Sequence, residues 1–196
     1  QILSIKCTER EAIISTVGSI ETDARTFYGV SALSPYKLAM SGETEDKICW
    51  SIVSIAEGNV EKNHYICNRS QSWFSRSDSY LDTSQDKSRV YISCGAGSSD
   101  PNPAVYCYSV SDGMMIFMYQ HSHLTYPMGL CVDMQDNICI LNSDKTLGIH
   151  QLARDGEMIQ IFPTEGYNTI CFDEKEKELF AAGPLRNEIR RYQLVQ

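Results

Sequence analysis

The chain has 196 residues, of which 42% are apolar and 21% charged, and its formal net charge is -8 at pH 7. No apolar run approaches the ~18 residues that a membrane helix needs, so we expect a soluble globular chain without a membrane partner. The 17 Lys and Arg residues are outnumbered by 25 Asp and Glu residues and form no basic arm, which disfavours strong phosphate binding.

Short apolar runs separated by turn-forming residues predict β-strands along the whole N-terminal half. The first 20 residues contain two such runs, Ile2–Cys7 and Ile13–Val17. A group of four follows, and then a second group of four with a longer loop, Gly95–Pro103, in its middle. The predicted strands of these two groups are Tyr28–Ala32, Tyr36–Ser41, Ile48–Val53, Val60–Cys67, Ser79–Asp82, Arg89–Cys94, Ala104–Val110 and Met114–Tyr119.

The clearest group lies between Tyr126 and Phe162. Asn, Asp, Gly and Ser, which favour tight turns, separate runs of about 5 residues, the usual strand length. The predicted strands are Met128–Val132, Ile138–Leu141, Leu147–Leu152 and Met158–Phe162.

The last group contains three predicted strands and ends at Gln196. Two stretches also have helical features: Thr8–Glu11 has the form of a capping box, and residues 173–180 are rich in helix formers. Both stretches lie between apolar runs where the neighbouring groups have turns. We therefore predict strand, turn and strand at both places, and almost no helix in the chain.

The groups repeat at a nearly constant spacing. Asp112-Gly113 lies 43 residues before Asp155-Gly156, and Leu130–Asp133 lies 40 residues before Ile170–Asp173. His150-Gln151-Leu152 is followed 42 residues later by Tyr192-Gln193-Leu194. A period near 42 with four strands in each unit is typical of β-propeller blades.

The predicted fold class is therefore all-β, a β-propeller of four-stranded antiparallel blades. Residues 1–196 form one domain or the C-terminal portion of one, with N-terminal strands in 1–20 and blades at about 26–67, 72–120, 126–162 and 166–196. The predicted strands amount to about four blades. Either the ring is an unusual four-bladed one or, as the period favours, the chain is part of a larger, six-bladed ring. An N-terminal strand would then be available to complete the C-terminal blade.

Alternating apolar residues of the 126–162 group should face the neighbouring blades. These residues are Val132, Ile138, Ile140, Leu147, Ile149, Ile159 and Ile161.

Most of the eight cysteines lie within apolar runs, such as Tyr91–Cys94 and Gly129–Val132. Buried free thiols are therefore favoured over a disulfide framework, and a cytoplasmic location is expected. No Cys-x-x-Cys motif occurs, which removes the usual zinc-ribbon and thioredoxin signatures. The chain opens at Gln1 without an initiator Met, so we expect it to be processed or cut from a longer protein.

The segment Tyr126–Asp133, followed by Asp136–Ile140, resembles an NHL repeat, whose blades open with a Pro-x-Gly-hydrophobic-x-Val-Asp strand. Ile149–Leu152 and Asp155-Gly156 also fit this pattern, whereas the namesake Asn-His-Leu tripeptide is absent near Asp144–Leu147. The chain is most similar in outline to the C-terminal propeller of tripartite-motif (TRIM) proteins. That resemblance implies a substrate-binding region of a ubiquitin ligase whose catalytic RING and B-box would precede Gln1.

The chain contains histidines and aspartates that could act in catalysis or bind a metal, but their patterns favour structural roles. His121 and His123 form a close pair with no nearby third ligand, which is a weak metal site. Asp133 and Asp173 recur at the same blade position, as expected for carboxylates that accept hydrogen bonds in the following turn. We identify no nucleophile elbow or phosphate loop and predict no catalytic residue, metal or cofactor.

Binding residues are expected on the loops that join successive blades and on those that join second to third strands, because these loops share one face of a propeller. Trp73 belongs either to this face or to the groove between two blades. Aromatic and cationic side chains typical of interface anchors fall on these loops. The candidate binding residues are Trp73, Arg76, His121, His123, Tyr126, Tyr167 and Arg186.

The leading hypothesis is a non-enzymatic platform that recognises a protein or peptide. RNA binding is attested among relatives of the NHL family and would use the same face, but the acidic composition disfavours it. A propeller enzyme of lyase or lactonase type, with a metal in the central channel, would need three or more inward ligands that the sequence does not reveal.

Overall fold

The computed structural model describes residues 2–7, 12–18, 26–44, 47–68, 80–94, 103–142, 148–164, 166–183 and 186–193. The structure describes the backbone alone for β1, β2, Lys47, Cys67, Asn68, Arg186 and Asn187. These residues form 17 β-strands and no helix. The strands are β1 (Ile2–Cys7), β2 (Ala12–Gly18), β3 (Thr26–Ser34), β4 (Lys37–Glu43), β5 (Lys47–Ser54), β6 (Asn59–Asn68), β7 (Tyr80–Thr83), β8 (Arg89–Cys94), β9 (Ala104–Ser109), β10 (Met115–Tyr119), β11 (Pro127–Val132), β12 (Ile138–Asn142), β13 (Ile149–Leu152), β14 (Met158–Phe162), β15 (Thr169–Asp173), β16 (Glu178–Gly183) and β17 (Arg186–Gln193).

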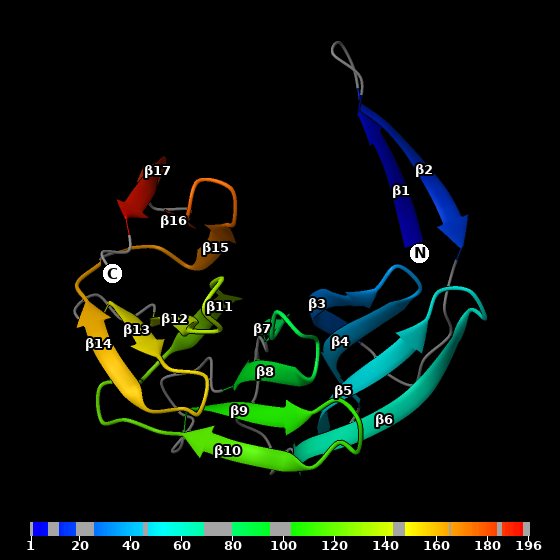
Figure 1. Ribbon diagram of the computed structural model, residues 1–196, viewed down its shortest axis with the longest axis horizontal. Helices are drawn as coiled ribbons and strands as arrows, with labels where there is room; N and C mark the ends of the chain where they lie inside the picture. Colours follow the sequence, from blue (N-terminus) through cyan, green and yellow to red (C-terminus); the bar gives the residue numbers. More distant parts are fainter. Residues whose placement is uncertain are drawn as a thin grey trace.

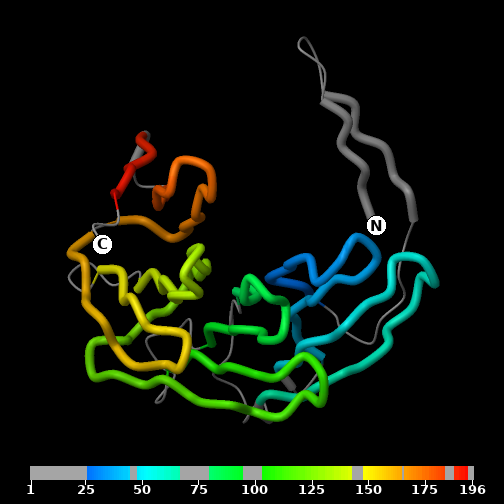
Figure 2. Tube along the Cα trace, viewed as in Figure 1, coloured from blue at the N-terminus to red at the C-terminus, as the bar shows by residue number. Residues whose placement is uncertain are grey.

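Consecutive strands pair antiparallel into separate sheets. We call the sheet β3–β6 blade 1, β7–β10 blade 2, β11–β14 blade 3 and the three-stranded sheet β15–β17 blade 4, while β1 and β2 form a two-stranded sheet. The four blades lie side by side in an arc, with β7 and β11 on its inner side and β6, β10 and β14 along its outside (Figure 1). Figure 2 shows that the chain visits them in sequence order. This radial arrangement confirms the predicted all-β propeller.

The predicted groups of strands agree with the observed ones. The chain from Asp173 to Glu178 is a strand end, a turn and a strand start, as predicted in preference to a helix, with Asp173 paired to Glu178. The other helical alternative, Thr8–Glu11, lies outside the described residues.

The turns that follow the innermost strands of blades 2, 3 and 4 share one geometry. Lys87, Asp136 and Lys177 all have a positive φ, between 57° and 64°, in the turns that lead into β8, β12 and β16. Asp133 Oδ1 accepts hydrogen bonds from the backbone N–H of Gln135 and Asn137, both at 2.8 Å. Asp173 Oδ1 likewise accepts from Lys175 and Glu176. The repeated aspartates therefore shape turns, as the sequence predicted.

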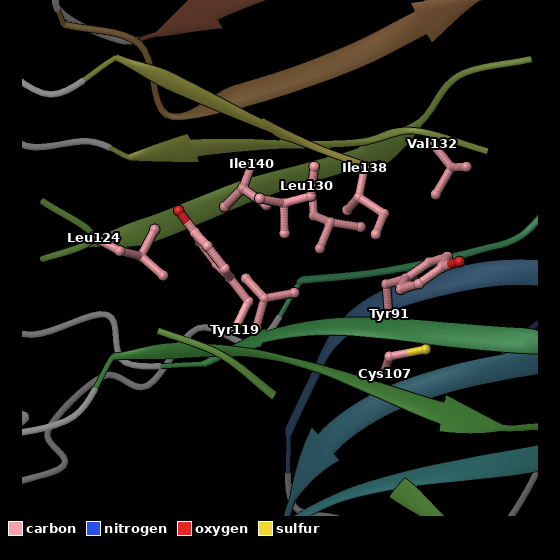
Figure 3. Packing of buried hydrophobic residues seen from close by; sticks show 10 residues of the cluster. Tyr91, Cys107, Tyr119, Leu124, Leu130, Val132, Ile138 and Ile140 are labelled. Atoms are coloured by element: carbon pink, nitrogen blue, oxygen red, sulfur yellow. The ribbon is translucent and has the colours of Figure 1, made fainter. Parts of the chain in front are cut away.

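Three apolar cores fill the spaces between adjacent blades. Trp50, Ile52, Leu81 and Val90 belong to the core between blades 1 and 2. Tyr91, Tyr119 and Leu124 pack with Leu130, Ile138 and Ile140 between blades 2 and 3 (Figure 3). Cys131, Leu141, Ile149, Ile170 and Leu179 belong to the core between blades 3 and 4. Blade 3 thus buries alternate residues of its strands on both faces.

Four of the residues expected between blades are buried: Val132, Ile138, Ile140 and Ile149. The expectation for Ile159 is wrong, because this side chain is 49% exposed on β14, the outermost strand of blade 3. Ile161, on the same strand, is half-buried, and Leu147 lies outside the described residues. Apolar alternation identifies a strand but does not tell how far the strand lies from the ring axis.

The outermost strands of blades 2 and 3 expose several large apolar side chains. Met114, Met115, Ile116 and Met118 are between 45% and 68% exposed at β10, and Met158 is 46% exposed on β14.

All six cysteines whose side chains are described are free thiols, and five of them are buried. In the described part of the chain, no helix has the length and apolar character to cross a membrane.

Candidate recognition face

The connection from blade 2 to blade 3 holds three of the candidate residues. It leaves β10 after Tyr119 and reaches β11 at Pro127. Leu124 is 1% exposed and lies in the core between the two blades, while its N–H donates to the carbonyl of His121 at 2.9 Å. One apolar side chain and one turn therefore fix the middle of this loop.

Asn142, at the end of β12, holds the rest of the loop. Its Oδ1 accepts from the N–H groups of Thr125 at 3.2 Å and Tyr126 at 2.7 Å, and its Nδ2 donates to the carbonyl of His123 at 2.6 Å. Asn142 itself is 1% exposed. Because a buried amide satisfies three backbone groups of the loop, the loop has a defined conformation before any partner binds.

The fixed loop leaves its own candidate side chains accessible to different degrees. His123 is exposed, whereas His121 and Tyr126 are half-buried. The N–H of His123 donates to Nδ1 of His121 at 3.1 Å, and the two rings lie edge to face with centroids 5.1 Å apart. The loop therefore presents two imidazoles and one phenol within a short stretch of fixed backbone.

His150, on β13, lies beneath this loop. Its ring centroid is 5.5 Å from that of His121, and its Nδ1 shares a 2.9 Å hydrogen bond with the hydroxyl of Tyr119. Burial lowers the pKa of His150 to about 4, and the nearby His121 and His123 act in the same direction. His150 is thus neutral at physiological pH. Despite this gathering of imidazoles, no group of three His, Cys, Asp or Glu side chains in the described residues is placed to hold a metal ion.

Tyr167 lies on the connection from blade 3 to blade 4, at the same face, but the structure gives it a role in the core. It is 1% exposed, and its hydroxyl donates to Oε1 of Glu188 at 2.8 Å. The guanidinium of Arg190 lies 5.7 Å from its ring centroid. Tyr167 therefore fixes the connection to β17 and is not exposed as a binding anchor, because the apolar core between blades 3 and 4 encloses its ring.

The structure does not describe the side chains of the three remaining candidate residues. Trp73 and Arg76 lie outside the described residues, and Arg186 is the first residue of β17, described by its backbone alone. Sequence reasoning missed Asn142 and His150. The predicted strand Ile138–Leu141 stops one residue short of Asn142, and only the place of this polar residue directly after an apolar run indicates a capping role.

A pocket of about 310 Å³ lies along the innermost strands, toward the turns opposite the loop face. Asp82, on β7, contributes its central polar group. Oδ1 of Asp82 accepts from Ser31 Oγ of blade 1 at 2.9 Å, and Oδ2 accepts from the N–H of Val132 of blade 3 at 3.0 Å. Burial raises the pKa of Asp82, although these hydrogen bonds oppose the shift. The carboxyl thus joins three blades at the ring interior.

Comparison with known proteins supports the fold alone. No protein-family model matches the chain, and no curated protein sequence matches it. Among solved structures, hydrazine synthase of Kuenenia stuttgartiensis aligns over 85% of this chain and 58% of its own, with 15% identity and a TM-score of 0.65. The β-propeller domain of Cps50 (Swd1) from Myceliophteria thermophila aligns over 98% and 63%, with 9% identity and a TM-score of 0.66. A streptogramin B lyase aligns over 90% and 57%, with 14% identity and a TM-score of 0.58.

The chain therefore spans less than two thirds of the length of these structures. They include a protein named as a propeller domain and two named as enzymes, so the propeller fold is shared by proteins of different function.

Proposed function

We propose that this propeller is a recognition module that binds a protein or peptide through the face formed by the blade connections. The observation that supports this most directly is the loop from His121 to Tyr126, whose backbone is held by the buried Asn142 while His123 stays exposed. Loops fixed on a rigid scaffold are common binding elements, because little conformational entropy is lost when the partner docks.

In its finer form, the proposal follows the NHL resemblance of Tyr126–Asp133. The partner would then be a protein substrate of a TRIM-type ubiquitin ligase, and the ligase activity would belong to modules outside these residues. A cytoplasmic setting is also part of the proposal, supported by the free thiols of the described cysteines.

The test compares proteins captured from cell extract by the wild-type propeller and by the His123→Ala, Tyr126→Ala and Trp73→Ala variants. Each substitution should weaken binding of the same partner by more than ~1 kcal/mol, as interface anchors do, while the unfolding midpoint changes little. Gln135→Ala is the matched control, because Gln135 is exposed in a turn at the opposite end of blade 3. Binding should fall only modestly between low and moderate salt.

Two results would contradict the proposal. One is partner binding that none of the loop-face substitutions affects. The other is nuclease-sensitive capture in which RNA is retained at moderate salt, which would favour the RNA-binding alternative.

A further inference from the structure

The innermost strands of blades 2, 3 and 4 each have a residue, at an equivalent position, that packs against the preceding blade. Leu81 of β7, Leu130 of β11 and Ile170 of β15 are 6%, 7% and 6% exposed and belong to the three cores between blades. Val30 occupies this position in β3. The alignment follows from the glycines: Gly29 precedes Val30 and Gly129 precedes Leu130, and both glycines approach the following blade closely. A Cβ there would lie 2.6 Å from Leu81 N and 2.9 Å from Ile170 N.

Val30 differs from its equivalents in one respect: it is 59% exposed. Its side chain has the same apolar character and the same place in its strand, so the exposure comes from the lack of a covering blade. The face of blade 1 that includes Val30 is therefore a blade-packing surface that is not covered in the described structure. We call this surface the acceptor flank.

The opposite end of the arc has the complementary surface. The next residue along each innermost strand points toward the following blade: Ser31 bonds to Asp82, Asp82 bonds to Val132, and Cys131 is 5% exposed in the core shared with blade 4. Cys171 occupies this position in blade 4 and is exposed. Ile189 of β17 is 71% exposed, and it alternates with Arg190, which contacts Tyr167 on the packed face. We call this surface, with Cys171 and Ile189, the donor flank.

We propose that the two flanks bind each other between two copies of this chain, which associate head to tail into a two-fold ring. Each internal junction already joins a donor face to an acceptor face, so the contact between copies would continue an interface that the chain forms three times within itself. A pair of copies covers both flanks at once. Head-to-tail contacts close into a ring when the rotation between copies permits it, and most soluble homo-oligomers have closed symmetry.

Sedimentation of the full chain over a range of concentrations tests the proposal. The wild type should be a dimer at micromolar concentration, and Val30→Arg or Ile189→Arg should weaken its association at least tenfold, because each places a charge in an apolar interface. Met158→Arg is the matched control: Met158 is 46% exposed, but it lies on the outer strand of blade 3, away from both flanks. This control should remain a dimer.

Mixing the two flank variants gives a sharper result. A Val30→Arg chain and an Ile189→Arg chain together retain one unaltered pair of flanks, so the mixture should form heterodimers that neither variant forms alone. Peptide-resolved alkylation should show Cys171 of the wild type reacting more slowly as the protein concentration rises.

A wild type that stays monomeric would overturn the proposal and favour blades from a longer polypeptide as the covering partner. Association that Met158→Arg abolishes and both flank substitutions leave intact would also overturn it. So would open filaments in place of dimers.

Discussion

His150 is a buried titratable side chain whose neutral form the fold requires. Burial lowers its pKa from 6.5 to about 4. Between these values the unfolded chain takes up a proton that the folded chain resists. The contribution of His150 to the free energy of unfolding is therefore complete above pH 6.5 and declines as the pH falls toward 4.

We expect His150→Gln to make the free energy of unfolding less dependent on pH in this window, because glutamine has no proton to gain. Urea unfolding at pH 7.5, 6 and 5 measures the difference in slope. The Met158→Gln variant, changed at an exposed position of the outer strand of blade 3, is the control and should keep the wild-type slope. Equal slopes for wild type and His150→Gln would show that His150 is not the group responsible.

At the scale of elements, the hairpin between β9 and β10 docks on the neighbouring blade through its turn. Gly113 has a φ of 73°, and a Cβ at this position would lie 1.9 Å from Cε1 of His64. The ring of His64 stacks on Trp50 with centroids 4.4 Å apart, so it has little room to retreat. Lys62 Nζ also donates to the carbonyl of Ser111 at 2.7 Å in the same turn.

Gly113→Ala should destabilise the protein by more than ~1 kcal/mol, the cost of a left-handed backbone at a non-glycine residue, because the contact with His64 adds to that cost. Urea unfolding followed by tryptophan fluorescence measures it. The same substitution in a His64→Ala background should cost less. An equal cost in both backgrounds would assign the whole effect to the backbone.

Strand positions could be predicted from sequence because alternation and turn residues are local signals. The side-chain contacts of the recognition face could not be predicted in this way. Asn142 bonds to a backbone group 16 residues away, and His150 bonds to a tyrosine 31 residues away. The burial of Tyr167 likewise depends on β17, which follows it in the chain. The Tyr119–His150 pairing arises only when two blades pack, and the other two only when distant strands of one blade come together, so no short sequence pattern reports them.

At the scale of the whole molecule, each blade packs on its sequence neighbours alone within the described residues, as in repeat proteins. Blade 3 has an apolar core on both faces, whereas the acceptor flank of blade 1 and the donor flank of blade 4 are exposed. Stability should therefore be highest in the middle of the arc.

Hydrogen exchange of the dilute protein should be slowest at the amides of β12 and β13 and faster in β3 and β17, because exposed blades open more readily. Mass spectrometry of peptic fragments measures this order. If the chain associates as proposed, exchange in β3 and β17 should slow as concentration rises, while β12 and β13 change little. Uniform exchange along the arc would contradict the unequal stability.

The apolar side chains on the outer strands also have a consequence for oxidation chemistry. Of the seven methionines, Met114, Met115, Met118 and Met158 are at least 46% exposed at these strands and Met134 is 48% exposed in the turn before β12, whereas Met128 is 9% exposed. Peroxide converts an accessible thioether into a polar sulfoxide, which disrupts a fold mainly where the sulfur is buried. Oxidation of several exposed methionines to sulfoxides, most of them along the outer edge of the arc, should therefore leave the protein folded. These methionines should be oxidised before any residue of the core.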